Sequence, residues 1–199
     1  SEALERQTAS AEVLQVISGS MADPKPVFDK ILDSCARLFG AGDPAVCLVD
    51  GDLLRIGAYR GKFTEEVDQA FPRPLAGTIS DMAIRQGSVL YRPSVLAAHD
   101  MADYIMEVAR RRGDFSVVNA PMTWNGRGIG TIDIICTPPR LFSDSELALV
   151  KTFADQAVIA IQNARLFNET REALERQTAT AEILKVISGS PTDTQPVFD

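Results

Sequence analysis

Residues 153–167 read FADQAVIAIQNARLF, a run without Gly or Pro in which apolar side chains recur every three or four positions. This is the spacing of one face of an α-helix. Upstream, residues 120–132 read APMTWNGRGIGTI, and the Asn125-Gly126 pair is a strong signal for a tight turn between two antiparallel strands. Ser143 and Glu146 have the spacing of a capping box, which marks the start of a helix. Residues 120–167 therefore predict a hairpin that leads into a helix.

The sequence before this stretch alternates between helical and strand patterns, which predicts an α+β domain. Helices are predicted where apolar residues fall on one face, and strands where short apolar runs end at turn residues. The predicted helices cover 26–39, 64–70, a stretch from Thr78 or Ser80 to Gly87, and 104–112, and the predicted strands cover 45–49, 53–59, 89–91, 115–124 and 128–137.

The two ends of the chain repeat each other. Residues 2–29 and residues 172–199 are identical at 21 of 28 positions, at an offset of 170 residues. Solenoid repeats are much shorter, roughly 20–50 residues, so the repeated unit is a whole domain with its connector. We predict a connector helix over 1–19, a domain over 20–168, and over 169–199 a second connector with the start of the next unit. We expect residues 190–199 to be poorly ordered or to dock on a neighbouring molecule.

Both connectors carry a heptad pattern filled largely by small or polar residues. No Gly or Pro occurs between Ser143 and Gly189, so one helix of roughly 45 residues and 65 Å is predicted. Helices this long form coiled coils or bridge between domains. We therefore expect a parallel dimer, with a solvated linker helix as the alternative. The predicted dimer-interface residues are Val150, Ala154, Ala157, Ile161, Ala164, Leu174, Ala181 and Leu184.

The hairpin from Pro121 to Gly130, the Phe142-Ser-Asp loop and the helix at 153–167 together resemble GAF domains. The resemblance covers about residues 20–168. It implies an α+β GAF fold in which a six-stranded antiparallel sheet has helices on both faces, flanked by long signalling helices. The helices of one face would form a dimer bundle, and a ligand pocket would lie on the other. The long connectors resemble those of bacterial tandem-GAF proteins, which implies neighbouring GAF repeats and a downstream histidine kinase or nucleotide cyclase domain as partners.

The family's pocket position, combined with strand alternation, indicates seven candidate ligand contacts. The ligand and any cofactor stay unidentified from the sequence. The Arg110-Arg-Arg112 run is predicted to be solvated, with a gate over an anionic ligand as the alternative. The candidate ligand-binding residues are Thr78, Met82, Tyr91, Tyr104, Phe115, Val117 and Asn119.

Composition excludes several other classes. The net charge of −7 argues against nucleic acid or an anionic membrane as the main partner. No apolar run approaches the roughly 18 residues of a membrane span, and the first residues lack the regions of a signal peptide. Three widely spaced cysteines, Cys35, Cys47 and Cys136, are typical of buried thiols in a reducing compartment. We therefore predict a cytoplasmic protein.

No catalytic or metal-binding constellation is evident in the sequence. The chain has a single histidine, His99, and lacks both the G-x-S-x-G and the Walker A motifs. We therefore expect no enzyme and no metal site, but a sensory module that dimerises through its terminal helices and passes a change to an output domain. Two alternatives remain: a purely structural spacer, and a thiol-dependent methionine sulfoxide reductase of the kind found in a small group of GAF proteins.

Overall fold

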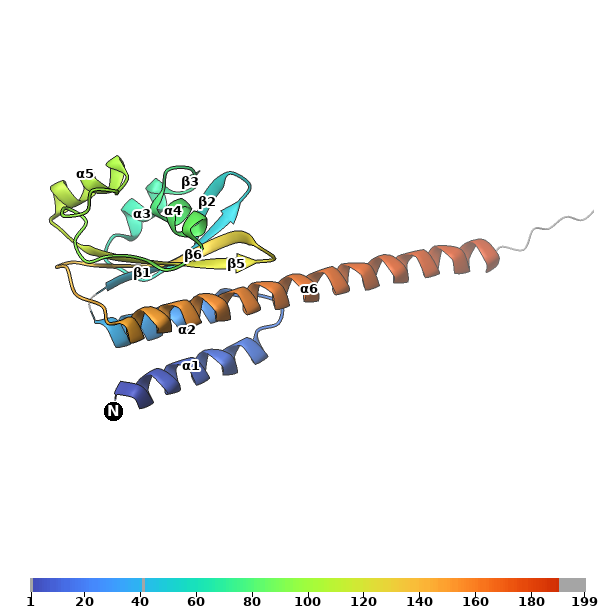
Figure 1. The fold of residues 1–199 in the computed structure, drawn as a ribbon. Helices are drawn as coiled ribbons and strands as arrows, with labels where there is room; N and C mark the ends of the chain where they lie inside the picture. Colours follow the sequence, from blue (N-terminus) through green and yellow to red (C-terminus); the bar gives the residue numbers. More distant parts are fainter. Residues whose placement is uncertain (1, 41, 190–199) are drawn as a thin grey trace, which may run out of the picture.

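The computed structural model describes residues 2–40 and 42–189, so the prediction for residues 190–199 lies outside the described residues. The fold is α+β, as predicted (Figure 1). In chain order the elements are α1 (Glu2–Gly19), α2 (Lys25–Phe39), β1 (Gly42–Asp50), β2 (Leu53–Tyr59), α3 (Thr64–Ala70), β3 (Arg73–Pro74), α4 (Ile79–Gln86), β4 (Leu90–Arg92), α5 (Asp103–Arg112), β5 (Ser116–Trp124), β6 (Arg127–Cys136) and α6 (Asp144–Gly189).

The six strands form one antiparallel sheet in the order β3-β2-β1-β6-β5-β4, which confirms the six-stranded sheet. The predicted hairpin joins β5 to β6 through Asn125 and Gly126, whose φ angles of 48° and 76° are both positive, as a type I′ turn requires. The pattern of apolar residues did not reveal β3, because it is only two residues long and contains Pro74.

Helices cover both faces of the sheet. α1, α2 and α6 lie on one side, and α3, α4 and α5 lie with their loops on the other (Figure 1). Successive side chains of β6 point to opposite faces of the sheet. Ile132 and Ile134 are buried against α2 and α6, while Asp133 and Ile135 point away from these helices. The sheet thus separates a large helix-side core from two smaller clusters on the opposite face.

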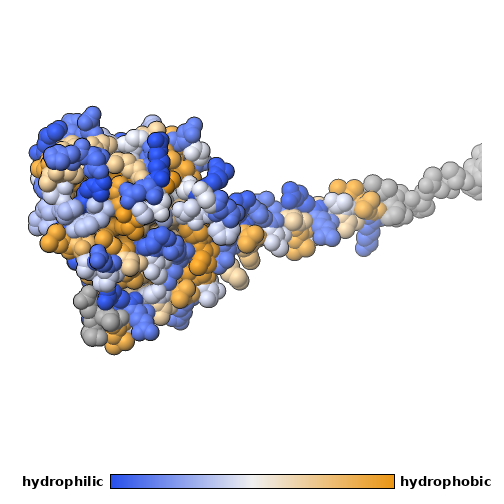
Figure 2. Space-filling view, in the orientation of Figure 1, coloured by the Kyte–Doolittle hydropathy of each residue, from blue (hydrophilic) through white to orange (hydrophobic). Residues whose placement is uncertain are grey.

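The helix α6 is 46 residues long and begins at the predicted capping box. The Glu146 N–H donates to Ser143 Oγ (3.3 Å), and the Ser143 N–H donates to Glu146 Oε2 (2.8 Å). The first part of α6 packs on the sheet and on α2, and the rest projects beyond the domain (Figures 1 and 2).

The burial of α6 corrects the interpretation of its heptad pattern. Val150, Ala154, Ala157 and Ala164 are buried inside the protomer, and Ile161 packs against the same core. These five side chains hold α6 to its own domain, so the pattern over this stretch reflects packing within one chain. Leu174, Ala181 and Leu184 lie on the exposed surface, where the predicted dimer contact stays a prediction.

In α1 the apolar residues fall on two opposite faces. Ala9, Val13 and Ile17 are buried against α2 and α6. The heptad residues Leu4 and Leu14 are exposed on the other side of the same helix. None of the described helices combines the length and apolar character needed to cross a lipid bilayer.

Gly130 offers a test of the strand packing at the centre of the sheet. A Cβ at this position would overlap with the carbonyl oxygen of Cys47 and the methyl group of Met122. We expect Gly130→Ala to lower the free energy of unfolding by about 1–3 kcal/mol, because the β1 backbone cannot move aside. Chemical denaturation measures this change.

The control is Gly19→Ala, where nothing lies within 4 Å of an added Cβ at the end of α1. It should be neutral or slightly stabilising, because Ala favours the helix more than Gly does. Equal losses for the two variants would contradict the predicted clash.

Candidate functional site

A cavity of about 180 Å³ lies on the face of the sheet opposite α2 and α6. β1, β2 and β6 form its floor, α3 and α5 close it from above, and Phe115 lies at its side. Pockets for drug-sized ligands measure roughly 300–1,000 Å³. The size therefore indicates a small molecule.

Most of the wall is apolar. β1 and β2 contribute Ala45 and Ile56, and the α3 region contributes Phe63, Val67 and Phe71. Val67 faces the cavity because α3 is short and turns this one side chain towards the sheet while its Glu65 and Glu66 side chains stay exposed. A ligand with an apolar body would replace water along this wall.

Asp133 is the polar centre of the floor. Its Oδ2 accepts hydrogen bonds from Cys47 Sγ (3.3 Å) and Ser80 Oγ (3.4 Å), and Ser80 Oγ in turn accepts one from Thr131 Oγ1 (3.0 Å). Its Oδ1 is shielded from solvent and has no hydrogen-bond partner among the described residues. Burial raises the pKa of Asp133 above its usual range, although hydroxyl, amide and thiol neighbours oppose the rise. An orphaned buried oxygen of this kind is suited to a donor group of a ligand.

The other charged groups of the cavity lie near its edge. The Arg112 guanidinium lies 4.2 Å above the centre of the Phe63 ring, and its Nη2 is 3.5 Å from Glu66 Oε1. The Arg112 side chain is 30% exposed, so it lies at the boundary between the cavity and solvent. Arg112 is thus the member of the arginine run that lines the cavity, while Arg110 and Arg111 are exposed.

The loop after β2 closes tightly over the same edge. The Lys62 N–H donates to Asp43 Oδ1 (3.1 Å), and the Phe63 N–H donates to Tyr59 OH (3.2 Å). A Cβ at Gly61 would overlap with both acceptor side chains, so a larger residue there would displace Tyr59 and Asp43 from these hydrogen bonds. Burial raises the pKa of Tyr59, which keeps its hydroxyl protonated at neutral pH.

The structure places the seven predicted ligand contacts in different environments. Phe115 lines the cavity, and Asn119 is buried on the same face of the sheet, close enough to Asp133 to affect its pKa. Met82, Val117 and Tyr104 belong to the neighbouring apolar cluster, where the Tyr104 hydroxyl accepts from the Ile79 N–H (3.2 Å).

The other two predicted residues have structural contacts. Thr78 caps α4, since its Oγ1 accepts from the Asp81 N–H (3.1 Å). Tyr91 points to the helix side of the sheet, away from the cavity. Ligand contact stays a prediction at all seven positions.

Sequence reasoning missed Asp133, Asp43 and Tyr59 as cavity residues. A signal for Asp133 existed, because it is the one charged residue in the apolar run Ile132-Asp-Ile-Ile-Cys136. A carboxylate in the middle of an otherwise apolar strand needs a partner if the sheet buries it.

The three cysteines are free and buried, as expected. Cys47 lines the cavity, whereas Cys35 and Cys136 lie in the helix-side core. Burial raises the pKa of all three thiols, and in Cys47 the adjacent Asp133 adds to the effect. Within the described residues, no group of three or more His, Cys, Asp or Glu side chains is placed to hold a metal ion.

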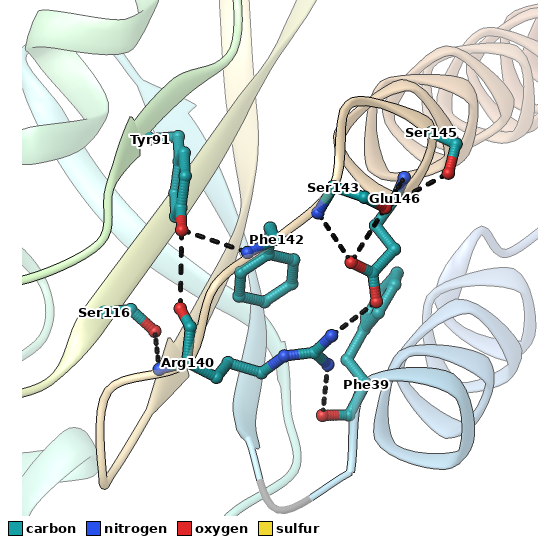
Figure 3. A network of polar contacts seen from close by, with 8 residues as sticks. All are labelled: Phe39, Tyr91, Ser116, Arg140, Phe142, Ser143, Ser145 and Glu146. Atoms are coloured by element: carbon teal, nitrogen blue, oxygen red, sulfur yellow. Dashed lines mark hydrogen bonds and ion pairs between the residues drawn. The ribbon is translucent and has the colours of Figure 1, made fainter.

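A second polar cluster joins β6 to α6 (Figure 3), and we refer to it as the junction. Arg140 is its centre: one guanidinium nitrogen donates to the Phe39 carbonyl at the end of α2 (2.7 Å), and the other pairs with Glu146 in α6. The Arg140 guanidinium also lies 4.4 Å above the centre of the Phe142 ring.

The junction also reaches the sheet. The Tyr91 hydroxyl accepts from the Phe142 N–H (3.0 Å) and donates to the Arg140 carbonyl (3.4 Å), and Ser116 Oγ accepts from the Arg140 N–H (3.2 Å). Burial opposes ionisation of Glu146, but the hydrogen bond from the Ser143 N–H and the pair with Arg140 outweigh it and hold the pKa of Glu146 below its usual range. The loop therefore ties β4 and β5 to the start of α6.

Comparison with known proteins gives one family and many similar structures. The sequence model of the GAF domain family matches residues 21–162. No curated protein sequence is similar enough to count as a relative.

Three solved structures illustrate the likeness of the fold. The GAF domain of a phosphoenolpyruvate-protein phosphotransferase from Coxiella burnetii has a TM-score of 0.70 and 12% identity, covering 85% of this chain and 99% of its own. A free methionine-R-sulfoxide reductase from Neisseria meningitidis has a TM-score of 0.67 and 18% identity, covering 83% and 92%. A domain described as part of a two-component sensor histidine kinase from Sinorhizobium meliloti has a TM-score of 0.60 and 19% identity, covering 73% and 95%.

Asp133→Asn should change how the free energy of unfolding depends on pH. The folded pKa of Asp133 lies above the unfolded value of about 3.9, so its ionisation lowers stability as pH rises through the folded pKa. The Asn side chain cannot ionise. Relative to the wild type, the variant should therefore gain stability as the pH rises above the unfolded pKa of about 3.9, as measured by chemical denaturation.

Glu146→Gln should show the opposite trend. The pKa of Glu146 is lowered, so its contribution is present above the unfolded value of about 4.3 and disappears as pH falls through the folded pKa. Relative to the wild type, this variant should lose most at neutral pH and least in acid. The same trend for both variants would contradict the two assignments.

Proposed function

The chain belongs to the GAF domain family, and we propose that it is a non-catalytic sensory and signal-transmitting module of a longer bacterial signalling protein. One observation carries the proposal: β6 lines the cavity with Asp133 and Ile135, and the loop that follows it adds Thr137 to the lining and continues through the Arg140 junction into α6. A change in the cavity thus has a short physical path to the projecting helix. GAF domains are typically regulatory, which agrees with this role.

The cavity favours a small, largely apolar molecule that carries an N–H or O–H donor. Its apolar walls would cover the body of the ligand, and Asp133 Oδ1 would accept from the donor. Arg112 and Asp43 at the edge could bind a second polar group. Binding would shift the equilibrium between arrangements of the α3 and α5 regions and thereby act on β6.

The proposed output is mechanical. α6 leaves the domain as a rod, and its exposed residues Leu174, Ala181 and Leu184 would meet the same residues of a second protomer in a parallel coiled coil. A seam that includes Gln177 and Ala181 is weak, so two registers of similar energy can coexist. We propose neighbouring GAF repeats and a kinase or cyclase domain as the downstream partners.

The environment of the thiols supports a non-catalytic role. Exchange with a substrate requires a thiolate, and burial raises the pKa of each cysteine. Cys47 is also separated by the sheet from Cys35 and Cys136, which disfavours an internal disulfide relay.

Filling the cavity tests the sensory proposal. A ligand at 100 times its dissociation constant should raise the melting temperature of the wild type by about 5–10 °C. Val67→Phe should abolish this shift, because Val67 lines the cavity and a larger side chain fills it. Thermal-shift measurements over a panel of amines, amino acids and nucleobases would find the ligand.

The matched control is Gln69→Phe on the exposed side of α3, which should keep the shift. A panel without any hit, or hits that Val67→Phe does not weaken, would favour the structural spacer over the sensor.

Leu174→Asp tests the dimer. Leu174 is 62% exposed in the single chain. A charge at this position of the seam should raise the dimer dissociation constant at least about 10-fold. Arg176→Asp, outside the seam on the same helix, is the control and should change little. Sedimentation that gives a monomer for the wild type at high concentration would disprove the dimer.

A further inference from the structure

We propose that residues 172–189 form a docking helix that binds a second copy of this domain in the position that α1 occupies here. This segment is the C-terminal part of α6, where it projects from the domain with no other described element beside it (Figure 1). The inference goes beyond dimerisation, because it assigns to this segment a second face and a second partner. That partner is the groove between α2 and α6 of another unit.

Apolar contacts hold α1 in this groove. Ala9 and Val13 have no exposed surface, and Ile17 is 6% exposed. These three residues contact the core formed by α2, α6 and the helix side of the sheet. The spacing of four residues between them makes a single apolar face of α1.

Polar contacts fix the register of α1 on both neighbours. Glu12 binds α2 through Lys30 (2.8 Å) and Arg37 (3.2 Å). On α6, the side-chain amide of Gln156 donates to Ser10 Oγ (2.9 Å). A carboxylate facing two cations and an amide facing a hydroxyl therefore flank the apolar face.

The C-terminal copy retains each of these groups. Residues 172–189 match α1 at 15 of 18 positions. Ala179, Ile183 and Ile187 stand where α1 has Ala9, Val13 and Ile17. Glu182 is identical to Glu12, and Thr180 has a hydroxyl group as Ser10 does. Two of the three differences thus preserve the apolar character at 183 and the hydrogen-bonding group at 180. The third places Lys185 at the position of Gln15, which is exposed in α1.

Ala179 and Ile183 differ in exposure from their counterparts in α1. Val13 is fully buried, whereas its counterpart Ile183 is 59% exposed, and Ala179 is exposed although Ala9 is buried. The helix thus repeats the groups that hold α1 in its groove, while Ala179 and Ile183 lie in solvent with no groove to cover them. A second copy of this domain supplies a groove of the required shape and charge.

The docking face differs from the proposed dimer seam. Leu174 and Leu184 correspond to Leu4 and Leu14, which are exposed while α1 lies in the groove between α2 and α6. Because the two sets lie on opposite sides of the helix, one segment can bind a groove and a coiled-coil partner together.

The position of α1 beside α6 also predicts the distance between successive units along the helix. α1 runs parallel to α6, since the hydrogen bonds of Gln156 with Ser10 and of Asn168 with the Ala22 carbonyl both join residues 146 positions apart. Thr180 would therefore lie beside Gln156 of the next unit. Positions 156 and 180 are 24 residues apart, so successive units would be displaced by about 36 Å along the helix.

The test uses the full chain with α1 weakened by Val13→Asp. The groove between α2 and α6, no longer filled by α1, should then bind residues 172–189 of another molecule. Light scattering should show association beyond a dimer that increases with concentration. Adding Ile183→Asp should weaken this association at least about 100-fold, because it places an unpaired charge in the groove. Adding Leu174→Asp should leave it in place.

The crossed pair separates this inference from the dimer. Ile183 and Leu174 are almost equally exposed, at 59% and 62%, so a general loss of hydrophobic surface would affect both variants alike. Leu174→Asp should weaken the parallel dimer at least about 10-fold and Ile183→Asp should preserve it. Equal effects of the two substitutions on the association, or no association of a folded Val13→Asp chain, would overturn the docking helix.

A second measurement avoids any change in α1. Since residues 172–199 copy residues 2–29, residues 30–199 can be joined after Asp199 to give a two-unit chain. Thr180→Cys with Gln156→Cys in the second unit should crosslink through a short bis-maleimide. Ser10→Cys with Gln156→Cys in the first unit is the positive control. A crosslink in the control alone would disprove the proposal.

Discussion

The alternation of side chains along β6 is the constraint on which the rest of the structure depends. Ile132, Ile134 and Cys136 enter the helix-side core, while Asp133 and Ile135 line the cavity. A shift of the register by one residue would bury Asp133 among α2 and α6 and expose the isoleucines to the cavity. β6 pairs with β1 on one side and β5 on the other, so both neighbours hold this register. The cavity and the helix bundle are two consequences of one strand.

The junction connects this strand to the helices α2 and α6. Arg140 lies in the loop between β6 and α6. It binds the last turn of α2, the first turn of α6 and, through its main chain, Ser116 and Tyr91. Charge-assisted hydrogen bonds of this kind are short and directional, so the start of α6 is held to several elements at once. Because the guanidinium also stacks on Phe142, a movement of the loop must change polar and apolar contacts together.

Much of the fold could be predicted from local patterns. The capping box at Ser143 and the Asn125-Gly126 turn depend on neighbouring residues, and both formed as expected. The strand β3 could not be found, because its two residues are defined only by pairing with Leu53 and Leu54. For the same reason the cavity was located less well than the fold: Asp43 and Tyr59 meet Arg112 only after the sheet has formed. Tyr91 shows the limit of position alone, since its alternation could be assigned only once the register with β5 was known.

The heptad pattern of α6 demonstrates why periodicity does not identify the partner. Between Val150 and Ala164 the apolar residues pack on the helix's own domain, and beyond Leu174 the same spacing continues in solvent. A helix follows its 3.6-residue period whatever it packs against, so the pattern predicts a buried face but not the surface that covers it. The repeat removes part of this ambiguity, because α1 presents nearly the same sequence already seated in a groove. Internal repetition therefore supplies what periodicity lacks: the structure of one copy in its bound position serves as the template for the other.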